Sequence, residues 1–112
     1  MTRGFDAAMR SMRSRDRQRQ EEGFAQLRAH AAEHIAGLIE QFENEGQDHG
    51  LRRWLLELIA GAESPAALPV LTAQLDSADE SLRRSATAGL TRLTTPEARS
   101  TLWRARANGT IT

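Results

Sequence analysis

Apolar residues recur along this chain at helical spacing, and no stretch alternates apolar and polar residues over the length of a strand. Leu68, Leu71 and Leu75, for example, fall at positions i, i+3 and i+7. The pattern predicts about seven helices, at residues 4–14, 17–30, 33–45, 49–62, 65–76, 80–93 and 96–107. With 112 residues, the chain is expected to form one all-α domain, residues 1–112.

Residues that start helices support these boundaries. Five predicted helices follow a residue whose side-chain oxygen can cap a helix N-terminus, namely Asp16, Asp48, Ser64, Asp79 and Thr95. Proline follows Ser64 and Thr95, and it is tolerated at the first helical position because the N–H that it lacks has no partner there. Gly46 and Gly61 lie near predicted helix ends.

One pattern, about a helix pair in length, occurs twice with an offset of 31 residues. Asp-x-x-Leu-Arg-Arg at 48–53 recurs at 79–84, and Ser-Pro-x-Ala at 64–67 recurs as Thr-Pro-x-Ala at 95–98. A weaker third copy lies upstream, where Asp16 aligns with the later aspartates but the Leu-Arg-Arg triplet is missing. A unit of this size cannot bury its own apolar face, so such units are expected to stack.

These motifs resemble the HEAT repeat, in its short bacterial form first noticed in phycobilisome lyases. The resemblance covers nearly the whole chain and implies a right-handed α-solenoid of stacked antiparallel helix pairs, with about three and a half repeats. It also implies a ladder of hydrogen bonds between neighbouring repeats. By matching positions, Asp48 and Asp79 would supply the acids and Arg52 and Arg83 the bases, with Asp16 as a possible third acid.

Composition excludes several function classes. The chain has no cysteine, which excludes disulfides, thiolate metal sites and cysteine nucleophiles. No apolar run approaches the length of a membrane span, and residues 1–19 lack the apolar core of a signal peptide, so we expect a cytoplasmic protein. The net charge is zero, but residues 1–20 and 82–112 are basic while residues 21–50 and 51–81 are acidic.

Two clusters could be taken for metal sites. His30-Ala31-Ala32-Glu33-His34 matches the H-x-x-E-H pattern of inverted zincins. The repeat alignment places a turn between helices at 30–33, which would separate the two histidines, so no metal or other cofactor is expected. The acidic residues Glu40, Glu43, Glu45 and Asp48 lack the spacing of a calcium loop. They are expected at a helix end and a loop, with an acidic binding surface as the alternative.

The arginine-rich stretch at 10–19 could bind phosphates, as some HEAT-type stacks do. No aromatic residue is interleaved with these arginines, and an acidic block follows, so a solvated surface is the simpler interpretation. No nucleophile, phosphate loop or pair of buried carboxylates indicates an enzyme. Trp103, beside Leu102 on the last predicted helix, is expected to cap the stack.

The leading hypothesis is a monomeric, non-catalytic module that binds another protein through the concave face of the second helices, 17–30, 49–62 and 80–93. Trp54 is either a core residue or the centre of this face. Equivalent positions give a predicted strip: Glu22, Gln26, Arg53, Trp54, Glu57, Arg84, Ser85 and Ala88. Because the upstream offset is 31 or 32, Glu21 is added as well. An immunity-type, partner-neutralising protein is one version of this hypothesis. The alternatives are nucleic-acid binding by terminal arginines and an accessory or lyase-like role in tetrapyrrole chemistry.

Overall fold

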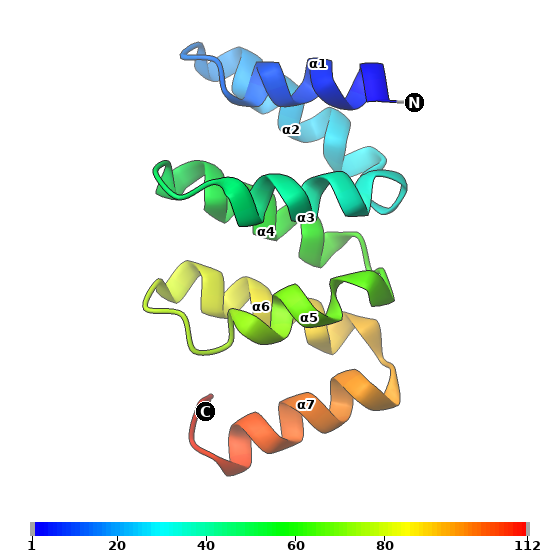
Figure 1. Ribbon diagram of the computed structural model, residues 1–112, viewed down its shortest axis with the longest axis vertical. Coiled ribbons are helices and arrows are strands. Elements are labelled where there is room, and N and C mark those ends of the chain that lie inside the picture. Colours follow the sequence, from blue (N-terminus) through cyan, green and yellow to red (C-terminus); the bar gives the residue numbers. More distant parts are fainter. Residues whose placement is uncertain (1, 112) are drawn as a thin grey trace.

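Helices follow one another along the whole of the chain that the computed structural model describes, residues 2–111 (Figure 1). The seven α-helices in this range are α1 (Thr2–Met12), α2 (Arg17–Ala29), α3 (Ile35–Asn44), α4 (His49–Gly61), α5 (Leu68–Ala73), α6 (Glu80–Leu93) and α7 (Pro96–Ala107). Short 3-10 segments, η1 (Ala31–His34) and η2 (Pro65–Ala67), precede α3 and α5. The predicted all-α class and the number of helices are confirmed.

The predicted start signals account for most of the observed helix boundaries. The side chains of Asp16, Asp48 and Asp79 each accept a hydrogen bond from a backbone N–H in the first turn of α2, α4 and α6. Ser64 and Thr95 do the same for η2 and α7. The predicted helices at 80–93 and 96–107 have the observed bounds, whereas those at 33–45 and 65–76 each begin with a 3-10 segment.

The helices form pairs that follow one another along the longest axis of the molecule (Figure 1). Within pairs, α1 packs on α2, α3 on α4 and α5 on α6, and α7 packs on α6 at the end. Helix α4 also contacts both α2 and α6, so the second helices of successive pairs are neighbours. The described chain measures 42 × 26 × 20 Å. No helix within residues 2–111 is long and apolar enough to cross a membrane.

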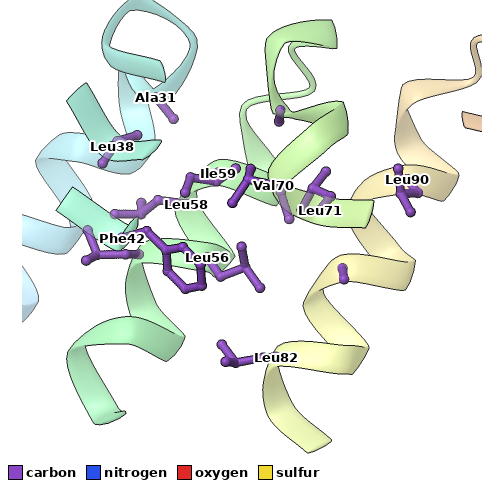
Figure 2. Close-up of a cluster of buried hydrophobic side chains, with 14 of the residues drawn as sticks. Ala31, Leu38, Phe42, Leu56, Leu58, Ile59, Val70, Leu71, Leu82 and Leu90 are labelled. Atoms are coloured by element: carbon purple, nitrogen blue, oxygen red, sulfur yellow. The ribbon is translucent and has the colours of Figure 1, made fainter. Parts of the chain in front are cut away.

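Helix α4 contributes the most deeply buried part of the core. Leu55, Leu56 and Ile59 are 0 % exposed, and Leu56 and Leu58 lie beside Phe42 of α3 (Figure 2). A helix buried on several sides needs apolar residues on most of its circumference, as the sequence of α4 has. The prediction that this helix lies in the middle of the fold is therefore confirmed.

Two ion pairs join successive helix pairs. Arg13, after α1, donates to Oε1 of Glu45, after α3, over 2.8 Å. Arg53 of α4 donates from Nε to Oδ2 of Asp79, the N-cap of α6, over 2.9 Å. Ion pairs therefore connect successive helix pairs, and Asp79 takes part in one of them.

The predicted ladder partners are nevertheless wrong in detail. Arg52 donates to the backbone carbonyl of Glu45 over 2.8 Å and covers the Phe42 ring at 4.3 Å, and Arg83 donates to the carbonyl of Ser77 over 2.7 Å. Both arginines therefore hold the loop that precedes their own helix. Asp48 caps α4, and the arginine that reaches the next pair is Arg53, one position further along the helix.

Candidate functional site

The site predicted from the sequence lies on the neighbouring helices α2, α4 and α6. We call the surface that these three helices share on the side of Arg53, Trp54 and Glu57 the second-helix face. Most of the predicted strip is on the surface: Glu22, Gln26, Arg53, Glu57, Arg84 and Ala88 are exposed, and Trp54 and Ser85 are half-buried. The α4 members Arg53, Trp54 and Glu57 therefore occupy the part of this helix that the core leaves uncovered.

The sequence allowed Trp54 to be either a core residue or the exposed centre of the binding face, and in the structure it is half-buried. Its indole packs against the hydrophobic core without being enclosed by it. It also contacts the ring of Phe24 from α2, with ring centroids 4.8 Å apart and planes tilted by 49°. Tilted aromatic pairs at this distance are stabilising beyond the area that they bury. The pair fixes Trp54 between α2 and α4 while part of the indole stays accessible.

On α2, the neighbour of Trp54 is Phe24, which the sequence analysis did not select. Residues two apart on an α-helix are about 200° apart around its axis. Glu22 and Gln26, each two residues from Phe24, are exposed and project from the opposite side of α2. The prediction that they continue the row of Trp54 is therefore wrong. The signal that was available is that Phe24 is the only aromatic residue of α2 and, besides Leu27, its only large apolar residue.

Two hollows lie along the junction of α2 and α4, one on each side of the Phe24–Trp54 pair. The first, of about 270 Å³, lies at the helix N-termini and is lined by Trp54 together with Met12, Arg17, Gln20, Asp48, Gly50 and Leu51. The second, of about 370 Å³, lies towards the C-termini and is lined by Phe24, Arg28, Ala31, Glu57, Leu58, Gly61, Glu63 and Arg92. Both hollows open where α4 has a glycine in place of a side chain.

A third hollow, of about 700 Å³, lies over α6. Arg84 and Ala88 of the predicted strip line it together with Glu80, Arg83 and Thr87, and the C-terminal residues Thr110 and Ile111 form its other wall. The amides of Thr110 and Ile111 donate to the carbonyl of Ala105, which holds this segment at the end of α7. The basic end of the strip is therefore an open recess in which Arg84 and Ala88 stay exposed.

The charges on the second-helix face differ in whether they are already paired. Arg84 hydrogen-bonds Glu80 over 2.7 Å, and this contact lowers the pKa of Glu80 and raises that of Arg84. The Arg53 hydrogen bond likewise lowers the pKa of Asp79. Around the second hollow, by contrast, three charged side chains are not paired within the described part of the chain. Within residues 2–111, no ion pair involves Arg28, Glu57 or Arg92, so these three charges are available to a ligand.

The histidine cluster has no continuous helical face. Helix α2 ends at Ala29, before His30, and His34 ends the 3-10 segment η1. The ring of His30 lies 3.3 Å from Glu33, whereas His34 packs against Phe5 with ring centroids 5.3 Å apart. In the described part of the chain, no three His, Cys, Asp or Glu side chains are grouped so that they could hold a metal ion.

Trp103 does not close the core. Leu102, its neighbour on α7, is buried in the hydrophobic core, but Trp103 is 70 % exposed. The two residues are about 100° apart around the helix, so only one of them can face α6. The expectation that Trp103 caps the stack is therefore wrong.

Comparisons of the chain with protein-family profiles, with curated proteins and with solved structures find no match.

Proposed function

We propose that this chain is a non-catalytic module that binds another protein through the second-helix face. The observation that carries this proposal is the half-buried Phe24–Trp54 pair, held between two helices with a hollow on either side. Tryptophan and arginine are the residue types most enriched where truncation weakens protein–protein binding most. Trp54 is fixed in position by its neighbours, so little conformational entropy is lost when a partner covers it.

The same proposal extends to the architecture. We propose a HEAT-type stack, a right-handed α-solenoid of about three and a half antiparallel helix pairs, with the second-helix face as its concave side. Three observations support it: the sequence repeat at an offset of 31, the pairing of consecutive helices, and the contacts of α4 with both α2 and α6. Stacks of this kind provide an extended binding surface, which suits an adaptor, a regulator or a protein that neutralises its partner.

The second-helix face also indicates which chemical groups the partner should carry. An apolar side chain would pack on the accessible part of the Trp54 indole, and charged groups would pair with Arg28, Glu57 and Arg92 around the second hollow. Because these charges are of both signs, the partner segment should be mixed in charge rather than uniformly acidic. We further propose that the chain acts in the cytoplasm as a monomer.

Site-specific photo-crosslinking tests this assignment. A photo-reactive amino acid replaces Glu57 on α4 or, as the matched control, the exposed Glu40 on α3, and each variant is irradiated in an extract of the source cells. We expect one dominant crosslinked protein with the Glu57 probe, and its loss when Trp54→Leu is added. Equal crosslinking from Glu40, or crosslinking that is indifferent to Trp54→Leu, would place the binding surface elsewhere.

A further inference from the structure

Helix α7 exposes the one large hydrophobic side chain that is mostly in contact with solvent among the described residues. Trp103 is 70 % exposed, while Ala98, Leu102 and Ala105, which lie about 100–160° away from it around α7, are buried. Arg99 precedes Trp103 by four residues and Arg106 follows it by three, and both are exposed. At this spacing all three residues lie on one face of the helix. We call Arg99, Trp103 and Arg106 the α7 face.

The sequence repeat shows how α7 differs from its counterpart within the stack. At an offset of 31, Arg99 corresponds to Leu68 of α5, and Arg106 corresponds to Leu75, just after α5. Leu75 is buried and Leu68 packs against the core. Positions that hold leucines in the interior of the fold therefore hold arginines at its end.

The charges of the α7 face have no acidic partner within the described residues. Arg99 donates to the backbone carbonyl of Thr94 over 2.8 Å, and neither it nor Arg106 takes part in an ion pair there. The only acidic residue on α7 is Glu97, in its first turn. An apolar ring between two cations without acidic partners matches a ligand that supplies both an apolar group and carboxylates or phosphates.

We propose that the α7 face binds an acidic, amphipathic helix of a partner protein. Arg99 and Arg106 are seven residues apart, which is about two turns or about 10.5 Å along the helix. Two carboxylates seven residues apart on a second helix have the same separation, and an apolar residue between them would meet Trp103. Single-stranded nucleic acid is the poorer match, because it is usually bound by several aromatic side chains on which successive bases stack, and this face has one.

Binding of a designed peptide tests the proposal. The probe is a fluorescein-labelled, alanine-based peptide of about 20 residues, long enough to be helical, with two glutamates seven residues apart and a leucine between them. Its comparison peptide carries glutamine in place of both glutamates. We expect micromolar binding of the glutamate peptide and at least about tenfold weaker binding of the glutamine peptide, as measured by fluorescence anisotropy.

Variants locate the binding on α7. Trp103→Ala and Arg106→Gln should each weaken binding, Trp103→Ala by about tenfold or more, while Arg10→Gln on α1 and Trp54→Leu on α4 should leave it unchanged. When Trp54 is replaced by phenylalanine, Trp103 is the only tryptophan in the chain. Binding of the glutamate peptide should then shift the tryptophan fluorescence of this variant to shorter wavelength. Three outcomes would each overturn the proposal: equal binding of both peptides, no effect of Trp103→Ala, or tighter binding of an oligothymidine strand than of the glutamate peptide.

Discussion

Arg53 and Asp79 form a 2.9 Å ion pair that connects the exposed face of α4 to the first turn of α6. Asp79 has a second role, since its other carboxylate oxygen accepts a hydrogen bond from the backbone N–H of Ser81 and so caps α6. Arg53→Gln removes only the link between helices, whereas Asp79→Ala removes the link and the cap. We therefore expect Asp79→Ala to lower the free energy of unfolding more than Arg53→Gln does, in urea denaturation. Similar losses would mean that the cap contributes little.

Burial distinguishes two large apolar residues on different helices. Leu55 is 0 % exposed in the middle of the fold, and Leu→Ala at such a position typically costs about 2–5 kcal/mol. Trp103 is 70 % exposed, so Trp103→Ala should change the stability by less than about 1 kcal/mol. Chemical denaturation of the two variants checks this. Equal losses would show that Trp103 is packed in solution.

Two glycines on neighbouring helices should respond in opposite ways to alanine. A Cβ on Gly89 of α6 would lie 2.9 Å from both the Cβ of Ala60 and Cδ1 of Leu71, so Gly89→Ala should force α4 and α6 apart and cost about 1–3 kcal/mol. A Cβ on Gly61 meets nothing within 4 Å, so Gly61→Ala should be neutral or stabilising by up to about 1 kcal/mol. Thermal unfolding of both variants measures the difference. Because Gly61 lines the second hollow, Gly61→Trp should also obstruct a ligand there without disturbing the core.

Acid should weaken the junction between the first two helix pairs. The backbone N–H of Asp48, the side chain of Arg13 and the backbone N–H of Gln47 together lower the pKa of Glu45 from 4.5 to about 2. Because the folded state holds this carboxylate ionised, its stabilising effect is complete above pH 4.5 and is lost as the pH falls towards about 2. We expect Glu45→Gln to lower the melting temperature at neutral pH, and the difference from the parent protein to shrink over that range. Glu43→Gln, at an exposed position on α3, is the control and should leave the pH dependence unchanged.

The sequence was sufficient to predict the helices because their starts carry local chemical signals. Asp79 and Thr95 cap α6 and α7 as their residue types predict, and both helices have the predicted bounds. The 3-10 segments before α3 and α5 were missed, since the same residue types occur in the first turns of both kinds of helix.

The site was predicted only in part, because its register depends on tertiary contacts. The upstream repeat lacks Leu-Arg-Arg, so an offset of 31 could not be distinguished from 32, and a change of one residue rotates a side chain by about 100° around the helix. Asp16 and Asp48 are 32 apart, but with that offset Trp54 corresponds to Glu22, which lies on the opposite side of α2 from Phe24. No alignment within the sequence could show that Phe24 contacts Trp54.

The sharpest test of the second-helix face is truncation of its central residue. Trp54→Ala should weaken partner binding at least about tenfold while the variant stays folded, because the indole is only partly enclosed by the core. Trp54→Phe, which retains a ring against Phe24, is the matched control and should lose less affinity. Circular dichroism and a cooperative unfolding transition establish that each variant is folded. If Trp54→Ala unfolds, a bulky substitution at Gly61 gives a second way to block the same surface.

Measuring association and dissociation rates distinguishes the role of the Arg84 charge from that of the apolar contact with Trp54. Arg84 lines the open recess over α6 and is exposed, so it should act on the approach of a partner more than on the bound complex. Arg84→Glu should therefore slow association more than it speeds dissociation, and the effect should diminish as salt is added. Arg84→Gln removes the charge without reversing it, and also avoids a like-charge contact with Glu80, so its smaller effect calibrates the measurement. If Arg84→Glu instead changes dissociation alone, Arg84 contacts the partner directly and the recess is part of the bound interface.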